Sequence, residues 1–269
     1  MQTKINEYLN LVNSSSFPYP CYTETNLTYD YDKLCNNDLA KISSIGLGLI
    51  RQFHPSIWRC NIAEHLSPLD AWHNETIMSK VIANRIKYLK TENLSLNNLL
   101  TGLSVTKLAP KVSIFRPAMA KYLVQKYLNK YDTIFDPCAG FSGRMLGACC
   151  LGKKYIGQDI NSTTVYESKQ LKEFLQLNAE LLIKDSLYDS GEYDCLFTCP
   201  PYGNKENWHQ NIEELSADEW ITRCLQNYKC KRYLFVIDKT EQYSQYVVEK
   251  LQNKSHFSAA SELVILIDK

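Results

Sequence analysis

From Tyr131 onward, the chain alternates apolar strand-like segments with helix-like segments. This order is typical of a parallel sheet whose connecting helices cover both faces. The predicted strands span 132–136, 154–159, 180–184, 193–199, 232–237 and 262–268. The predicted helices span 143–151, 162–177, a segment opening at Ser216, and 241–253. The sequence therefore predicts an α/β fold for this part of the chain.

A turn of small residues follows the first predicted strand. It reads Asp136-Pro137-Cys138-Ala139-Gly140-Phe141-Ser142-Gly143 and leads directly into a helix. The two glycines let backbone N–H groups approach a ligand at the carboxyl edge of a parallel sheet. The turn contains no G-x-G-x-x-G run, and no lysine follows its glycines as in a phosphate-binding loop. This pattern disfavours a dinucleotide or a nucleotide phosphate as the ligand.

The predicted strand 193–199 ends in a second motif, Thr198-Cys199-Pro200-Pro201-Tyr202. Its prolines fix the turn and leave no competing N–H group. The side chain of Cys199 and the backbone carbonyl of Pro200 can accept hydrogen bonds from a substrate amine. The ring of Tyr202 offers a face on which an extruded base can stack.

Taken together, these two motifs resemble those of the S-adenosylmethionine-dependent amino-methyltransferases of nucleic acids. In that family the first motif reads Asp-Pro-Phe-x-Gly-Ser-Gly, whereas here the second glycine is displaced by one residue. The second motif is similar to Thr-Ser-Pro-Pro-Tyr, with Cys199 in place of the serine. The segment 115–123 resembles the one that precedes the cofactor motif in such enzymes. The resemblance covers roughly residues 113–269.

The resemblance implies a Rossmann-like class I methyltransferase core, with S-adenosylmethionine as the cofactor and DNA as the partner. The enzyme would flip a base and methylate adenine N6 or cytosine N4. In the implied site, Asp159 accepts the ribose hydroxyls, Asp136 faces the ammonium group, and Asp185 or Ser186 meets the adenine amine. At Asp185, capping of the local turn is an equal alternative. The predicted cofactor-binding residues are Phe115, Asp136, Cys138, Ala139, Gly140, Gly143, Asp159, Ile160, Asp185 and Ser186.

The predicted catalytic residues are Cys199, Pro200, Pro201 and Tyr202. A thiol is a weak acceptor, so Cys199 keeps three alternatives open. It could be a nucleophile for C5 methylation of a pyrimidine, or the chain could be a catalytically silent subunit that binds the cofactor. The run from Pro200 to Gly203 also fits guanine-N2 enzymes that act on transfer RNA. Protein-glutamine enzymes are disfavoured, because they carry Asn before the prolines.

The predicted substrate-binding residues are Asn204, Lys205, Trp208 and Arg59. The first three lie in a polar segment directly after the catalytic motif. Arg59 lies in the region 1–110, which we expect to be a mainly helical appendage for nucleic-acid recognition, followed by a catalytic domain over 111–269. Residues 51–117 hold nine Lys and Arg against four Asp and Glu. Such a basic surface can follow a phosphate backbone, although from charge alone an ordinary solvated helical face is the favoured explanation. Trp58 and Trp72 are further candidates, Trp72 being at least as typical of a core.

The composition excludes several other classes. No run of eighteen apolar residues is present, and residues 1–10 lack a signal-peptide pattern, so we expect an intracellular protein, nuclear in a eukaryote, with no membrane partner. The ten cysteines form no C-x-x-C pair. We therefore expect reduced thiols and no metal site. The formal net charge of +1 does not indicate a partner.

Overall fold

The computed structural model describes residues 1–201, 215–252 and 261–269. Among them the chain divides into two compact units. The helical unit comprises residues 1–21 and 55–113, and the sheet unit comprises residues 22–54 with the described residues from Ile114 to Lys269. A single boundary near residue 110 therefore leaves residues 22–54 on the wrong side. These residues fold with the sheet unit because the apolar side chains Leu34, Leu49 and Ile50 are fully buried within it.

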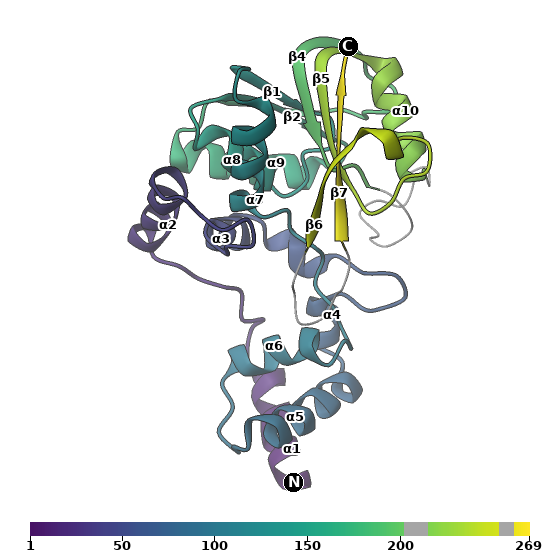
Figure 1. Ribbon diagram of the computed structural model, residues 1–269. Coiled ribbons are helices and arrows are strands. Elements are labelled where there is room, and N and C mark those ends of the chain that lie inside the picture. The colour runs from purple at the N-terminus through teal and green to yellow at the C-terminus, as the bar shows by residue number, and fades with distance from the viewer. Residues whose placement is uncertain (202–214, 253–260) are drawn as a thin grey trace. The chain divides into compact units, whose positions relative to one another are not determined.

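The sheet unit is built on seven strands in the order β3-β2-β1-β4-β5-β7-β6 (Figure 1). Their bounds are β1 Thr133–Asp136, β2 Lys154–Asp159, β3 Ala179–Ile183, β4 Gly191–Thr198, β5 Tyr228–Ile237, β6 Val247–Gln252 and β7 Ser261–Asp268. Strands β1 to β5 pair in parallel, and β7 is antiparallel to both β5 and β6. This order with one reversed strand is the Rossmann-like methyltransferase sheet, so the predicted fold class is confirmed.

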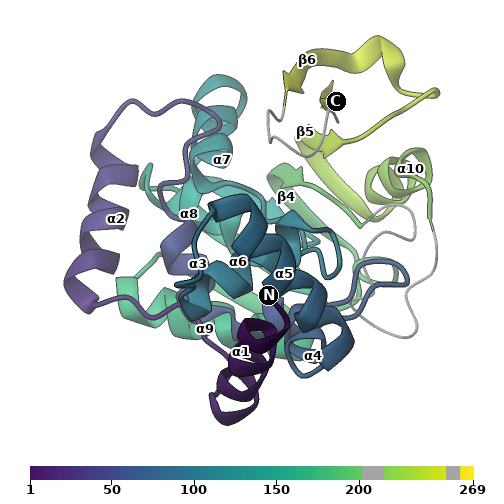
Figure 2. The same cartoon turned by 90° about the horizontal axis from the view of Figure 1, so that it is seen from below.

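Helices cover the two faces of this sheet (Figure 1). They are α2 Glu24–Asn36, α3 Leu47–Phe53, α7 Pro117–Leu123, α8 Gly143–Cys149, α9 Ser162–Leu175 and α10 Ala217–Asn227, with a π-helical turn over Val124–Leu128 after α7. On one face, α10 packs on a core that includes Phe135, Tyr228 and Phe235. On the other, α7 packs closely on α8, where a Cβ on Gly147 would lie 2.4 Å from Ala120 Cβ. Helix α3 contacts α9 and α2, as Figures 1 and 2 both show.

The predicted helix 241–253 is wrong. A short 3-10 turn, Ser244–Tyr246, is followed by β6, which pairs with β7 through Lys250 opposite Leu263 and Leu251 opposite Glu262. The Glu, Gln and Lys residues here have good helix propensity. Differences in helix propensity are only about a few tenths of a kcal/mol per residue, and pairing at the sheet edge outweighs them.

The helical unit contains α1 Gln2–Ser14, η1 Pro55–Arg59, α4 Pro68–Trp72, α5 Glu75–Leu89 and α6 Leu96–Val105. Helices α4 and α5 are separate because the Asn74 side chain accepts a hydrogen bond from Ile77 N (3.0 Å) and caps α5. The mainly helical character is confirmed.

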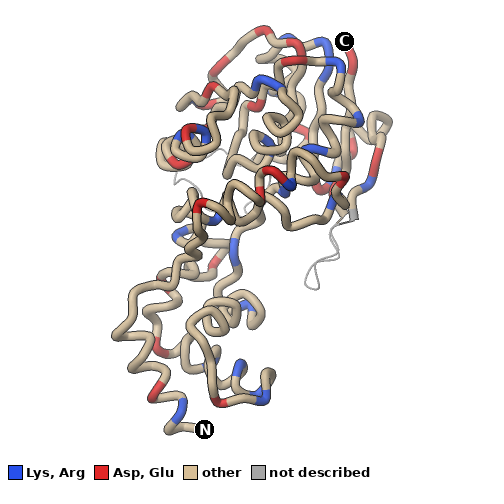
Figure 3. The backbone as a smooth tube through the Cα atoms, turned by 90° about the vertical axis from the view of Figure 1, so that its left-hand side faces the viewer, with Lys and Arg blue, Asp and Glu red and all other residues tan. Residues whose placement is uncertain are grey.

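The two tryptophans of the helical unit are core residues. Trp58 and Trp72 are 2% and 0% exposed, and the Phe17 ring lies 5.6 Å from each of them. Trp58 is therefore not available to a nucleic acid, which corrects that candidate. Arg85 is also buried, so it adds no charge to the surface. Residues 1–21 and 55–113 hold eight Lys and Arg and five Asp and Glu, and both signs occur along the backbone in Figure 3. No helix in the described part of the chain is long and apolar enough to span a membrane.

Candidate functional site

The carboxyl ends of four neighbouring strands meet in a group of loops that hydrogen bonds tie together. The turn after β1 contacts the end of β2, where Gly140 N donates to Asp159 Oδ2 (2.9 Å) and Ala139 N donates to the carbonyl of Gln158 (2.8 Å). It also contacts the loop after β3, where Cys138 Sγ lies 3.6 Å from Ser186 Oγ. The predicted cofactor residues of three separate motifs are thus brought to one edge of the sheet.

Asp136, the last residue of β1, is fully buried and lies at the centre of this network. Its Oδ2 accepts hydrogen bonds from Arg144 Nε (2.6 Å) and Tyr155 OH (2.7 Å). Its Oδ1 accepts from Thr198 Oγ1 (2.7 Å) and Cys138 N (3.1 Å). These donors compensate the cost of burying a carboxylate. They also use the capacity of both oxygens, which favours a structural role for Asp136 and, of the two expected contacts with an ammonium group, the one through water over the direct one.

The Thr198 bond links the two halves of the site. Thr198 is the last residue of β4 and precedes Cys199, so the strand that carries the predicted catalytic motif is fixed to the turn after β1 through Asp136. Cys199 is half-buried, Pro200 is buried and Pro201 is exposed. Tyr202, Asn204, Lys205 and Trp208 lie outside the described residues.

Arg144 is a residue that the sequence reasoning missed. Its guanidinium is 4% exposed, also donates to the Cys138 carbonyl, and lies 5.1 Å from the centroid of the Phe115 ring. Burial alone would lower the pKa of Arg144. Attraction to Asp136, with a smaller contribution from Cys199, more than offsets this and raises the pKa. Arg144 therefore stays charged next to the end of β4. A lone Arg in an otherwise apolar helix was the signal in the sequence.

Glycine is suited to these two positions of the turn for different structural reasons. Gly140 has a φ of +56°, and a Cβ there would meet only the Cys138 carbonyl, at 4.0 Å, so this side of the turn is open. A Cβ on Gly143 would lie 1.9 Å from the Phe115 carbonyl oxygen. Gly143 is thus required by the packing of Phe115 on α8, a reason that is independent of its predicted role as a ligand contact. Phe115 itself is half-buried, and its ring meets Phe197 edge-on at 5.8 Å.

Asp159 ends β2 beside the open turn. Oδ2 accepts from Gly140 N and Oδ1 accepts from Asn161 N (2.9 Å). Burial raises the pKa of this carboxyl. With one backbone donor on each oxygen within the described chain, lone pairs remain for two hydroxyl groups. Ile160, the next residue, is 36% exposed at the same strand end.

Asp185 and Ser186 follow β3. Asp185 Oδ1 accepts a hydrogen bond from Leu187 N (2.9 Å), so the capping alternative describes this side chain in the structure. Ser186 is buried, and its carbonyl accepts hydrogen bonds from Tyr228 OH and Asn227 Nδ2, each at 3.2 Å. Arg59 ends η1 of the helical unit and is exposed.

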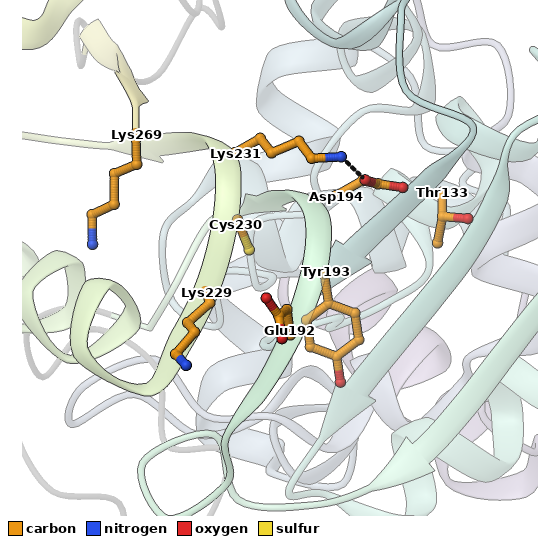
Figure 4. A pocket seen from close by; sticks show the side chains of 8 residues that line it. All are labelled: Thr133, Glu192, Tyr193, Asp194, Lys229, Cys230, Lys231 and Lys269. Carbon is orange, nitrogen blue, oxygen red and sulfur yellow. Dashed lines mark hydrogen bonds and ion pairs between the residues drawn. The ribbon is translucent and has the colours of Figure 1, made fainter.

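A pocket of about 510 Å³ lies at the opposite edge of the sheet (Figure 4). Its lining residues come from the first residues of β1, β4 and β5 and from the last residue of the chain: Thr133, Glu192, Tyr193, Asp194, Lys229, Cys230, Lys231 and Lys269. One ion pair, Lys231 Nζ to Asp194 Oδ1 at 2.7 Å, crosses it. None of the predicted site residues lines it. Within the described residues, no group of three or more His, Cys, Asp and Glu side chains is arranged to hold a metal ion.

Comparison with known proteins adds no family assignment, since no protein-family model and no curated protein matches the chain. Solved structures do match. A class I S-adenosylmethionine-dependent methyltransferase proposed for Listeria monocytogenes aligns over 92% of this chain and 88% of its own, at 13% identity and a TM-score of 0.49. An RNA methyltransferase proposed for Pyrococcus horikoshii aligns over 57% of this chain and 82% of its own, at 11% identity and a TM-score of 0.45.

A third match is a 16S rRNA N2 G1207 methyltransferase of T. thermophilus, in complex with AdoMet and guanosine. It aligns over 59% of this chain and 44% of its own, at 14% identity and a TM-score of 0.41. At such identities the likeness concerns the fold, and it carries no information about the substrate.

Proposed function

We propose that the chain is an S-adenosylmethionine-dependent methyltransferase that methylates an exocyclic amine of a base in DNA. The observation that carries this proposal is the bond between Thr198 and Asp136, which fixes the Cys199-Pro200-Pro201 segment beside the turn that follows β1. A group transfer needs its donor and its acceptor held next to each other. Two loops fixed together at one sheet edge meet that requirement.

The residues around the turn fit the proposed cofactor. Gly140 leaves one side of the turn open, as a closely approaching ligand requires. Asp159 has lone pairs suited to a ribose diol, and it lies one hydrogen bond from Gly140. Cys138 and Ser186, in contact with each other, border the place where the adenine ring would lie. When bound, the cofactor supplies an electrophilic sulfonium methyl group.

The chain would make four contributions to the reaction. The carbonyl of Pro200 and the side chain of Cys199 would accept hydrogen bonds from the substrate amine and orient its lone pair. Tyr202 would stack on the extruded base. Arg144, whose buried charge is stabilised by the ion pair with Asp136, would supply a fixed positive charge beside Cys199. The exposed Arg59, together with Asn204, Lys205 and Trp208, would contact the nucleic acid.

The test is transfer of tritium from labelled S-adenosylmethionine to unmethylated genomic DNA and, in parallel, to total transfer RNA, followed by nucleoside analysis. N6-methyladenine or N4-methylcytosine in DNA supports the proposal. Label only in RNA moves the substrate to RNA, and C5-methylated pyrimidine makes Cys199 a nucleophile. Bound cofactor without any transfer identifies a silent subunit and contradicts the proposed activity.

A further inference from the structure

A buried polar chain outside the proposed catalytic motifs reaches the cofactor turn from the segment 22–54. His54, directly after α3, is 0% exposed. Its Nε2 lies 2.9 Å from Ser142 Oγ, and its Nδ1 lies 3.2 Å from Glu167 Oε2 on α9. Ser142 Oγ also lies 2.8 Å from Ser168 Oγ, again on α9. Ser142, Ser168 and Glu167 are all at most 5% exposed.

This chain has a definite consequence for the backbone of the turn. Ser142 adopts the left-handed conformation, with φ 63° and ψ 5°. For a residue with a Cβ, that conformation costs about 1–2 kcal/mol. Ser142 stands just before α8, but its hydroxyl makes no capping bond to that helix and is turned instead toward His54. The strained backbone of Ser142 is therefore accompanied by a buried hydrogen bond between its hydroxyl and His54.

The imidazole is held from several sides. The Phe141 ring meets it edge-on at 5.5 Å, and α3 is attached to α9 through the Phe53 and Phe174 rings, whose centroids lie 5.1 Å apart. The Ser142 hydroxyl donates to Ser168 Oγ, so it accepts its second hydrogen bond from His54 Nε2–H. Through its two nitrogens the ring connects α9 to the turn.

We infer that His54 is a positioning residue for the cofactor: through Ser142 it fixes the turn 140–143 in the shape that leaves Gly140 open. Asp136 and Asp159 fix the beginning and the middle of the same turn, and His54 fixes its end. The inference rests on the proposed function, since it takes S-adenosylmethionine as the ligand of that turn. It also assigns a role to the segment 22–54, in which none of the predicted motifs lies.

Two substitutions separate the two bonds of His54. The amide of His54→Gln reaches the place of Nε2 and can keep the bond to Ser142, whereas the amide of His54→Asn reaches only the place of Nδ1 and keeps the bond to Glu167. Calorimetric titration of S-adenosylmethionine should show an increase in Kd of about tenfold for His54→Asn, the loss expected for one buried hydrogen bond. His54→Gln should stay within about threefold of the wild type, on the same scale.

A matched control removes buried packing away from the turn. Ile265→Val deletes one methyl group from a fully buried side chain on β7 and should lower the melting temperature while leaving the Kd unchanged. Hydrogen exchange without ligand gives a second measurement, in which the Ser142 and Gly143 amides should exchange faster in His54→Asn than in His54→Gln.

Each outcome has one meaning. Wild-type affinity and wild-type exchange in His54→Asn overturn the inference, and so does an equal loss of affinity in Ile265→Val, because the effect would then be general destabilisation. A folded wild type that binds no S-adenosylmethionine overturns the proposed function itself.

Discussion

The two edges of the parallel sheet both carry charged side chains, but they use them differently. At the carboxyl edge, the polar groups of Asp136, Arg144 and His54 are buried and bonded to partners from separate loops. At the amino edge, the charges of Asp194 and Lys231 are exposed and pair with each other across an open pocket. The pocket lies at the amino edge, whereas the strained turn and the open glycine lie at the carboxyl edge.

The difference shows how many hydrogen bonds and ion pairs a site with buried charges needs. Burying a charge requires several compensating bonds, and the carboxyl edge has them because its loops have fixed positions. An exposed ion pair contributes little and fixes nothing. The substitutions that follow test this contrast, beginning with the largest expected effect.

Asp136→Asn should have the largest effect. It leaves the Arg144 guanidinium buried without its carboxylate, and breaking a buried pair in this way costs about 3–5 kcal/mol. Thermal unfolding should show a fall in melting temperature of about 10 °C for a chain of this size. A fall of one or two degrees would mean that the network around Asp136 contributes little to the fold.

Gly143→Ala should come next. The added methyl group would lie 1.9 Å from the Phe115 carbonyl oxygen, so the backbone must shift. Over-packing of this kind costs about 1–3 kcal/mol or more, and urea unfolding should show it. Gly140→Ala is the matched control, because only its positive φ is strained; its cost should be about 1 kcal/mol. Equal costs at the two positions would contradict the distinction between packing and openness.

Glu249→Gln tests a carboxylate that accepts several hydrogen bonds and lies away from the proposed site. Glu249, on β6, accepts hydrogen bonds from Lys41, Tyr122, Lys126 and Tyr127. Burial would raise the pKa of Glu249, but the bonds from Lys41, Lys126, Tyr127 and Tyr122 outweigh it and lower the pKa to about 2.

A lowered folded-state pKa gives stability that is present above the ordinary value of 4.5 and is lost as the pH falls toward 2. The variant should therefore lose about 1–2 kcal/mol at pH 7, and the difference from wild type should shrink below pH 4. Melting curves across this range measure it. A difference that stays constant with pH would contradict an ionised Glu249.

Asp194→Asn should have the smallest effect. Its pair with Lys231 is exposed, with 51% and 73% of the side chains accessible, and such pairs contribute little. Both the melting temperature and the transfer of label from S-adenosylmethionine should match the wild type. A loss of transfer at normal stability would place the chemistry at the amino edge and reverse the comparison.

The sequence predicted the sheet better than the site. Alternation of apolar and polar segments located six strands, and the Asp136-to-Gly143 turn located the carboxyl edge. The strand β6 was missed because pairing with β7, a long-range contact, decides its conformation. His54 gave no signal, since it is distant in sequence from both partners and meets Ser142 only through the packing of α3 on α9. Gly143 could not be told from Gly140 without the position of Phe115.

Calorimetric titration of S-adenosylmethionine into wild type and Gly140→Ala is the most direct test of the central claim, that the open turn beside Asp159 is the cofactor site. The account predicts saturable binding of one equivalent by the wild type. It predicts at least about a tenfold weaker Kd for Gly140→Ala, about 1.4 kcal/mol, although both proteins are folded. No binding by the folded wild type, or equal binding by the two proteins, would contradict it.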